Sequence, residues 1–104
     1  FEANPHVAFL LERSIRINGH GAWCKVVRAA VCDRVGTVTF HCHKREQGNS
    51  SLRGMDEGEL RRLGNDVSVI EAPATTLDAF FHDSMPRIDI LKMDAEGAEP
   101  LIFA

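Results

Sequence analysis

Carboxylates gather near the C-terminal end of the chain, directly after residues 88–93, a segment rich in Ile, Leu and Met. That segment is predicted to form a buried strand, and Asp94 and Glu96 come immediately beyond its end. Ligands of open α/β sheets bind beyond the carboxyl ends of the strands, so Asp94 stands where chemistry is usually done. A second acid, Glu2, follows what we interpret as the last residue of another strand. Together, Glu2 and Asp94 predict part of a nucleotide-type cofactor site.

Both acids can do chemistry, and both have an alternative structural role. A carboxylate at a strand end can accept hydrogen bonds from ribose hydroxyl groups, each contributing about 1.5–3 kcal/mol. A carboxylate can also remove the proton of a reacting hydroxyl group. Glu2, however, directly precedes a helix start, where an acid is favoured by the helix dipole. Asp94 can likewise cap a following helix through backbone N–H groups.

A helix is predicted over residues 5–17. Asn4 can cap its start, and Pro5 suits the first helical position because it has no N–H to leave unpaired. Apolar residues recur along one stripe of this stretch, as in an amphipathic helix. The Asn-Gly pair at residues 18–19 supplies the end.

Strands are predicted to alternate with the remaining helices. The stretch at residues 37–43 alternates apolar and polar side chains, and Thr75-x-x-Asp78 has the spacing of a capping box. Alternation of this kind indicates βαβ units and a mainly parallel sheet, hence an α/β fold. The predicted strands are residues 24–31, 37–43, 67–70 (closed off at Pro73) and 88–93, and the predicted short helices are residues 57–63 and a helix through residues 80–81.

His41 and His43 are the strongest candidates for metal ligands. On a strand they share one face about 7 Å apart, and both could reach one zinc ion with help from elsewhere. Cys42 would point the other way, and no second ligand pair occurs at a zinc spacing. We therefore interpret the histidines as surface residues and expect no metal site.

The composition excludes several classes of protein. Hydrophobic residues make up 44% and charged residues 26%, as in a soluble globular protein. No apolar run approaches the roughly 20 residues of a transmembrane helix, and a net charge of −3 gives no footprint for nucleic acid. The three cysteines lack a C-x-x-C pair, which favours a reduced, cytoplasmic compartment. The sequence gives no indication of an oligomeric state.

A series of motifs, in order along the chain, resembles the FkbM-type methyltransferases. The first, Phe1-Glu2-Ala3-Asn4-Pro5, resembles F-E-P-N-P, with alanine in place of the usual proline. The last, D-I-L-K-M-D-A-E-G-A-E at residues 89–99, differs only at Met93 and Ala95, where Ile and Val are common. Between them lie R-A-A-V-C-D at residues 28–33, G-T-V-T at 36–39, G-N-S-S-L at 48–52 and T-T-L-D at 75–78.

The resemblance implies an S-adenosyl-L-methionine-dependent O-methyltransferase with a Rossmann-like class I fold. The acceptor would be a hydroxyl group on a small molecule, a sugar or a glycan. The match covers residues 1–104 as a partial domain, from the end of the second strand to the helix after the fourth. The first strand, its glycine-rich turn and the C-terminal strands are expected outside it. We therefore expect residues 1–104 alone neither to bind the cofactor tightly nor to turn over.

The resemblance also implies roles for particular residues. Glu2 matches the ribose-binding acid, and Asp94 matches the acid near the methyl-donating sulfur and the acceptor. Glu96 is the second catalytic candidate, although Glu96 and Glu99 also suit a helix start. The further cofactor-binding candidates are Asn4, Ala30 and Asp33, the last also a plausible turn former. Ser50 and Ser51 are expected to border the acceptor pocket, although a polar loop explains them equally well.

Two other functional classes remain open. An acid after the second strand of a Rossmann fold also binds the ribose of NAD, so a nicotinamide-dependent oxidoreductase fits as well. A G-x-G-x-x-G turn upstream would favour that reading. The third class is a non-catalytic α/β interaction module, which is favoured if Glu2 or Asp94 faces away from any cleft. The enzymatic interpretation thus requires these two side chains to share a crevice.

Overall fold

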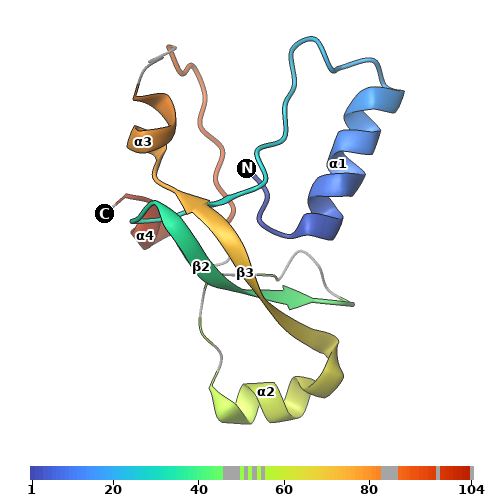
Figure 1. Cartoon of the computed structure of the whole chain (residues 1–104), viewed down its shortest axis with the longest axis vertical. Coiled ribbons are helices and arrows are strands. Elements are labelled where there is room, and N and C mark those ends of the chain that lie inside the picture. Colours follow the sequence, from blue (N-terminus) through green and yellow to red (C-terminus); the bar gives the residue numbers. More distant parts are fainter. Residues whose placement is uncertain are drawn as a thin grey trace.

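The computed structural model describes residues 1–45, 50, 52, 54, 56–82, 87–95 and 97–103, without the side chains of Leu60 and Asn65. Helices and strands are mixed along the chain, as the α/β prediction required. The elements are α1 (Pro5–Ile17), β1 (Ala30–Val31), β2 (Gly36–His43), α2 (Glu57–Leu63), the 3-10 helix η2 (Gly64–Asp66), β3 (Val67–Thr75), α3 (Leu77–Phe81) and α4 (Glu99–Ile102) (Figure 1).

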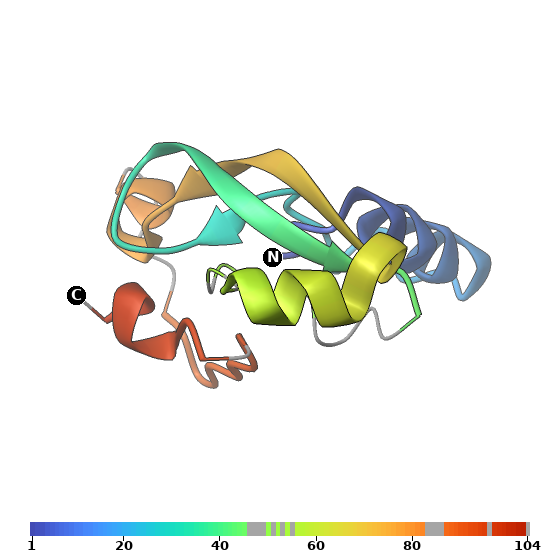
Figure 2. The same cartoon turned by 90° about the horizontal axis from the view of Figure 1, so that it is seen from below.

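The helices stand around a small sheet. Helices α1 and α4 lie on opposite sides of the molecule, and α2 lies beyond the far end of the β2–β3 ribbon (Figures 1 and 2). Among the described helices, none combines the length and hydropathy that crossing a bilayer requires.

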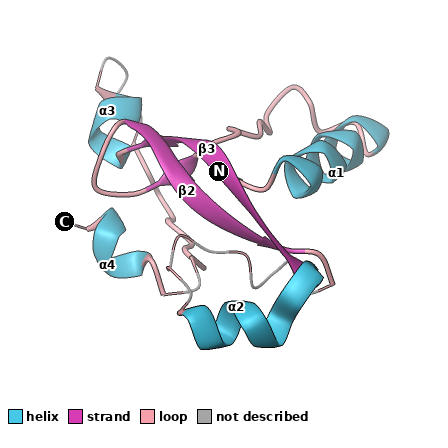
Figure 3. Ribbon diagram, turned by 60° about the horizontal axis from the view of Figure 1, so that its bottom comes forward, coloured by secondary structure: helices cyan, strands magenta, loops and turns pink. Residues whose placement is uncertain are grey.

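The three described strands form a mixed sheet in the order β1-β3-β2. Its long strands, β2 and β3, run through the middle of the molecule (Figure 3). Strand β1 pairs with β3 in parallel, with Ala30 opposite Ala74. Strand β2 pairs with β3 antiparallel along its whole length, from Gly36 opposite Ala74 to His43 opposite Val67. The expected mainly parallel sheet is therefore not confirmed. Alternation of apolar and polar residues along β2 is the pattern of an antiparallel ladder with one exposed face. The structure confirms the antiparallel pairing, but Phe40, His41 and Cys42 are all buried, so the second half of β2 has no exposed face.

The buried core lies on one face of this sheet. It consists of small residues and one aromatic ring. These residues share a face because alternate residues of a strand point to the same side. Ala3 and Leu52 pack against both groups of core residues from outside the sheet. The buried members are Ala30, Cys32, Ala74, Phe40, Cys42 and Ala72.

Helix α1 confirms the prediction for residues 5–17. The Oδ1 atom of Asn4 accepts hydrogen bonds from the backbone N–H groups of His6, at 3.0 Å, and Val7, at 3.4 Å. Asn18 follows the last helical residue and donates its own N–H to Ser14. Local signals were sufficient here because the cap and the apolar stripe both lie within the helix itself.

Two predicted strands differ from the structure at the ends of the sheet. Only residues 30–31 of the predicted strand at 24–31 form a strand, because β3 pairs with nothing earlier in that stretch. The predicted strand at 67–70 instead runs on through Pro73 to Thr75. Pairing with β1 starts only at Ala74, so β2 is the one described strand beside Pro73, and the missing N–H of Pro73 is tolerated.

The predicted capping box at Thr75 is wrong by one residue. Thr76 is the N-cap of α3, and its hydroxyl oxygen accepts a hydrogen bond from the N–H of Ala79 at 2.9 Å. Thr75 is the last residue of β3, and its hydroxyl donates to the carbonyl of Thr76 instead. A helix in this region was correctly predicted, although its first residue was not.

The predicted strand at residues 88–93 is also wrong. This segment has no regular secondary structure, and Ile88, Ile90 and Leu91 are 50%, 87% and 51% exposed. A strand forms only where a partner accepts its backbone hydrogen bonds, and no described strand pairs with this segment. Its composition is that of a strand, but in the structure it serves to line a cavity.

Candidate functional site

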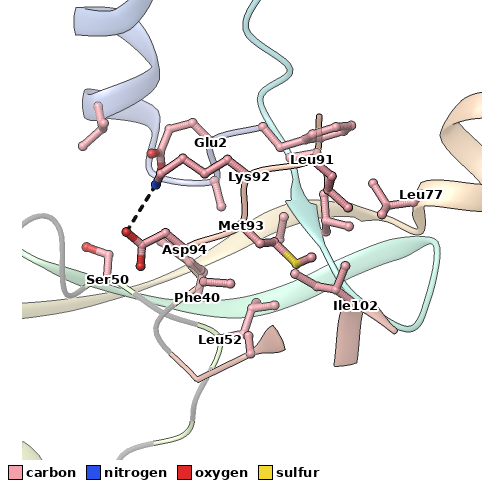
Figure 4. A pocket seen from close by; sticks show the side chains of 18 of the residues that line it. Glu2, Phe40, Ser50, Leu52, Leu77, Leu91, Lys92, Met93, Asp94 and Ile102 are labelled. Atoms are coloured by element: carbon pink, nitrogen blue, oxygen red, sulfur yellow. Dashed lines mark ion pairs between the residues drawn. The ribbon is translucent and has the colours of Figure 1, made fainter. Parts of the chain in front are cut away.

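A cavity of about 550 Å³ opens between the start of the chain, the sheet and the segment before α4. Four of its described lining residues carry polar side chains: Glu2, Ser50, Lys92 and Asp94. Figure 4 shows these four at one end, with apolar side chains such as Leu77 at the other. The remaining described lining is apolar: Phe1, Ala3, Val7, Ala29, Ala30, Val31, Phe40, Leu52, Leu77, Phe81, Ile88, Ile90, Leu91, Met93, Ala95, Ala98 and Ile102.

Glu2 and Asp94 line this same cavity although they belong to opposite ends of the chain (Figure 4). The geometric requirement of the enzymatic interpretation is therefore met. A non-catalytic interaction module would have been favoured if either acid faced away from any cleft, and neither does.

Glu2 is held by the backbone on both sides. Its own N–H donates to the carbonyl of Val27 at 2.9 Å, which fixes the main chain beside the sheet. Its Oε1 atom accepts a hydrogen bond from the N–H of Asn4 at 2.7 Å. Among the described residues, none donates to the second carboxylate oxygen. One oxygen is thus used to orient the group, and the other is left for a ligand.

Asn4 lies behind the cavity wall and is not among its lining residues. It is only 4% exposed, and every polar atom of its side chain is engaged. Its Oδ1 caps α1, and its Nδ2 donates to the hydroxyl oxygen of Ser50 at 3.5 Å. The structure therefore gives Asn4 a place in the framework that supports Glu2 and Ser50.

Asp94 is much more open than Glu2. Its side chain is 72% exposed, and its carboxylate forms an ion pair with Lys92 at 3.6 Å. Residues two apart on an extended segment point to the same side, which brings both charges to the cavity. The sequence reasoning missed Lys92, although its spacing from Asp94 was the signal that could have found it.

The other predicted site residues divide into three groups. Ala30 and Ser50 line the cavity with Glu2 and Asp94. Asp33 does not: both its oxygens accept hydrogen bonds from Arg34, at 2.8 and 2.9 Å. These bonds lower the pKa of the Asp33 carboxyl group. Predicted residues Ser51 and Glu96 lie outside the residues that the structure describes.

Glu99 takes the helix-start role that the sequence predicted for it. It is the first residue of α4, and its Oε1 accepts a hydrogen bond from the N–H of Ala95 at 2.9 Å. This bond to the backbone lowers the pKa of the Glu99 carboxyl group. The bond closes the turn that follows Asp94.

The interpretation of His41 as a surface residue is wrong. His41 is 8% exposed and His43 is half-buried, because the second half of β2 is covered on both faces. The Nδ1 atom of His41 has no hydrogen-bond partner among the described residues. Within the same part of the chain, no group of three or more His, Cys, Asp or Glu residues could hold a metal ion.

Cys42 is on the same strand as Phe40, which lines the cavity, and belongs to the same buried cluster. It is 7% exposed, and burial raises the pKa of its thiol. The negative charge of Glu2 raises the pKa of Cys42 further. The two groups are therefore close enough for the carboxylate to oppose ionisation of the thiol.

Comparison with known families gives a match. A family model described as the methyltransferase FkbM domain matches residues 1–104, the full length of the sequence. Searches of curated proteins and of solved structures find no match. The matched range includes both acids of the cavity and the segments that carry them. This chain belongs to the FkbM methyltransferase domain family.

Proposed function

We propose that this protein transfers a methyl group from S-adenosyl-L-methionine to a hydroxyl group on a small molecule, a sugar or a glycan. The observation that carries the proposal is the shared cavity of Glu2 and Asp94 in a member of a methyltransferase family. The proposal includes a Rossmann-like class I arrangement, in which such sites form beyond the strand ends.

The described lining of the cavity suits this cofactor. Its volume of about 550 Å³ is typical of sites for small molecules. The unpartnered oxygen of Glu2 can accept a hydrogen bond from a ribose hydroxyl. Ala30, 5% exposed at the end of the sheet, has too small a side chain to keep an adenine ring from the backbone. Glu2 and Ala30 would thus hold the nucleoside part.

Asp94 would serve the reacting hydroxyl group. The cofactor supplies an electrophilic methyl carbon and a thioether leaving group. As the acceptor oxygen forms its bond to that carbon, the hydroxyl proton must leave, and Asp94 would accept it. The carboxylate is exposed enough for an acceptor to reach it, and Lys92 holds it on the cavity side. Such positioning of the reactants supplies much of the rate.

The remaining candidate residues have different roles in this proposal. Glu96 stays the second catalytic candidate, and Ser51 stays a candidate at the acceptor side. Asn4 acts from behind the wall, through the groups that it holds. Asp33 is left out, because both its oxygens are already paired with Arg34.

The test is titration calorimetry of the intact protein with S-adenosyl-L-methionine. Replacing Glu2 by glutamine keeps the shape of the side chain and removes its charge. Loss of a charge-assisted hydrogen bond should weaken cofactor binding about 10- to 100-fold. Absence of binding by the unaltered protein would contradict the proposed cofactor.

Glu12→Gln is the matched control for that test. Glu12 lies on α1 and pairs with Arg28 rather than lining this cavity. The same change of carboxylate to amide there should leave cofactor affinity unaltered. Equal effects of the two changes would show that net charge, and not a ribose contact, determines the affinity.

A further inference from the structure

The hydroxyl group of Ser50 is already an acceptor twice. Its Oγ accepts hydrogen bonds from the N–H of His43, at 3.1 Å, and from Nδ2 of Asn4, at 3.5 Å. A serine hydroxyl has two lone pairs and one hydrogen. Both lone pairs are therefore occupied, and the hydrogen is what remains to be used.

In the part of the chain that the structure describes, no group accepts a hydrogen bond from that hydroxyl. Ser50 is half-buried and lines the cavity beside the polar group of Glu2, Lys92 and Asp94 (Figure 4). Neither donor to Oγ can rotate away freely, because one is the backbone of β2 and the other belongs to the buried cap of α1. The two fixed donors therefore leave the hydroxyl hydrogen of Ser50 to point away from both of them.

Ser50 and Glu2 are also anchored to the same residue. The backbone N–H of Asn4 holds one oxygen of Glu2, and its side chain holds the hydroxyl of Ser50. A carboxylate can only accept from a ligand hydroxyl, whereas that hydroxyl also offers lone pairs of its own. A donor in the same cavity, anchored through the same Asn4, would complete the set that a ligand hydroxyl requires.

We propose that Ser50 donates a hydrogen bond to the ribose hydroxyl that binds Glu2, and that Asn4 fixes Ser50 as the donor. This inference rests on the proposed function, since it takes the ribose to lie at Glu2. It moves Ser50 from the acceptor side of the site to the cofactor side. Asn4 becomes a positioning residue that never touches the ligand.

The experiment is a double-mutant cycle on S-adenosylhomocysteine binding, measured by calorimetry with the intact protein. Ser50→Ala removes the donor and should weaken binding about 3- to 10-fold. Asn4→Asp keeps the capping oxygen for α1 but replaces the donor by an acceptor. The Ser50 hydrogen would then turn to that carboxylate, and binding should weaken comparably.

The cycle separates this effect from the added charge. Asn4→Asp should cost clearly less affinity in the Ser50→Ala protein than in the unaltered one, because the donor is then already gone. Ser50→Thr, which retains the hydroxyl, serves as the conservative variant and should recover most of the affinity that Ser50→Ala loses. Equal costs of Asn4→Asp in both backgrounds would overturn the role of Asn4.

Analogues that lack one ribose hydroxyl identify the contact. The 2′-deoxy and 3′-deoxy forms of S-adenosylhomocysteine are titrated in turn, and Ser50→Ala should cost nothing against one of them. Undiminished binding of S-adenosylhomocysteine by Ser50→Ala would overturn the inference even if Glu2→Gln weakens it. An unaltered protein that does not bind at all would contradict the proposed function, and this inference with it.

Discussion

Glu2 and Asp94 line one cavity but are held in different ways. The carboxylate of Glu2 accepts a backbone hydrogen bond at 2.7 Å, from the N–H of the residue that caps α1. The carboxylate of Asp94 forms an ion pair with Lys92 at 3.6 Å, and the Asp94 side chain is 72% exposed. This difference suits a division of labour, with a fixed group for the cofactor and an accessible group for the acceptor.

Asp94→Asn should reduce methyl transfer much more than it reduces cofactor affinity. Loss of a general base typically costs about 10²- to 10⁴-fold in rate. The measurement is transfer of label from methyl-tritiated S-adenosyl-L-methionine to a panel of sugars and small hydroxylated molecules, alongside calorimetry. Asp89→Asn is the control, since Asp89 pairs with Arg87 outside the cavity lining. Full transfer by Asp94→Asn would remove Asp94 from the chemistry.

Thr76→Ala should destabilise the protein more than Thr75→Ala does. Thr76 caps α3, and loss of an N-cap typically costs about 1 kcal/mol. Free energies of unfolding from urea titrations measure the difference, and Thr76→Ser should restore most of the loss. A larger effect at Thr75 would mean that the helix begins where the sequence spacing placed it.

Sequence alone predicted the elements whose signals are local. The Asn-Pro start and the apolar stripe lie within α1, and the alternation of residues 37–43 lies within β2. The shared cavity of Glu2 and Asp94 also agrees with the sequence-based expectation. The sequence motifs were sufficient to place these two acids at one site, although residues 88–93 before Asp94 form no strand.

The errors arise where structure depends on a distant partner or on a competing neighbour. Residues 88–93 have strand composition, but composition cannot supply the second strand that a ladder requires. Asp33 looked available until Arg34, its direct neighbour, took both oxygens. His41 looked exposed because alternation indicates which face a side chain takes, and not what covers that face.

Cys42 should make the protein less stable as the pH becomes alkaline. Burial, with the charge of Glu2, raises the pKa of this thiol in the folded state. Its contribution to stability is therefore complete below the thiol pKa of the unfolded chain, about 8.5, and is lost as the pH rises through the higher folded value.

Urea unfolding between neutral pH and about pH 10 measures this loss. Cys42→Ala should flatten the alkaline decline, and Glu2→Gln should flatten it partly, because only one of the two causes is removed. An unchanged pH profile for Cys42→Ala would assign the decline to other groups.

His41→Phe should leave the protein as stable as before, or more so. The Nδ1 atom of His41 is buried without a partner among the described residues, and such a group costs about 1–3 kcal/mol. A phenyl ring fills similar space and has no such requirement. Unfolding free energies decide the matter, with Phe40→Ala as the contrast, expected to cost about 3–5 kcal/mol. A comparable loss for His41→Phe would reveal a partner that contributes stability.

The irregular segment before α4 has a thermodynamic consequence. Ile90 is 87% exposed, and residues 88–93 lack the ladder bonds that would immobilise them. A ligand seated between the two acids would meet one wall held by backbone hydrogen bonds at Glu2 and another without ladder bonds. We therefore expect more of the entropic cost of association to fall on the Asp94 side. Substitutions that stiffen this segment in its bound shape would tighten the complex without adding a single contact.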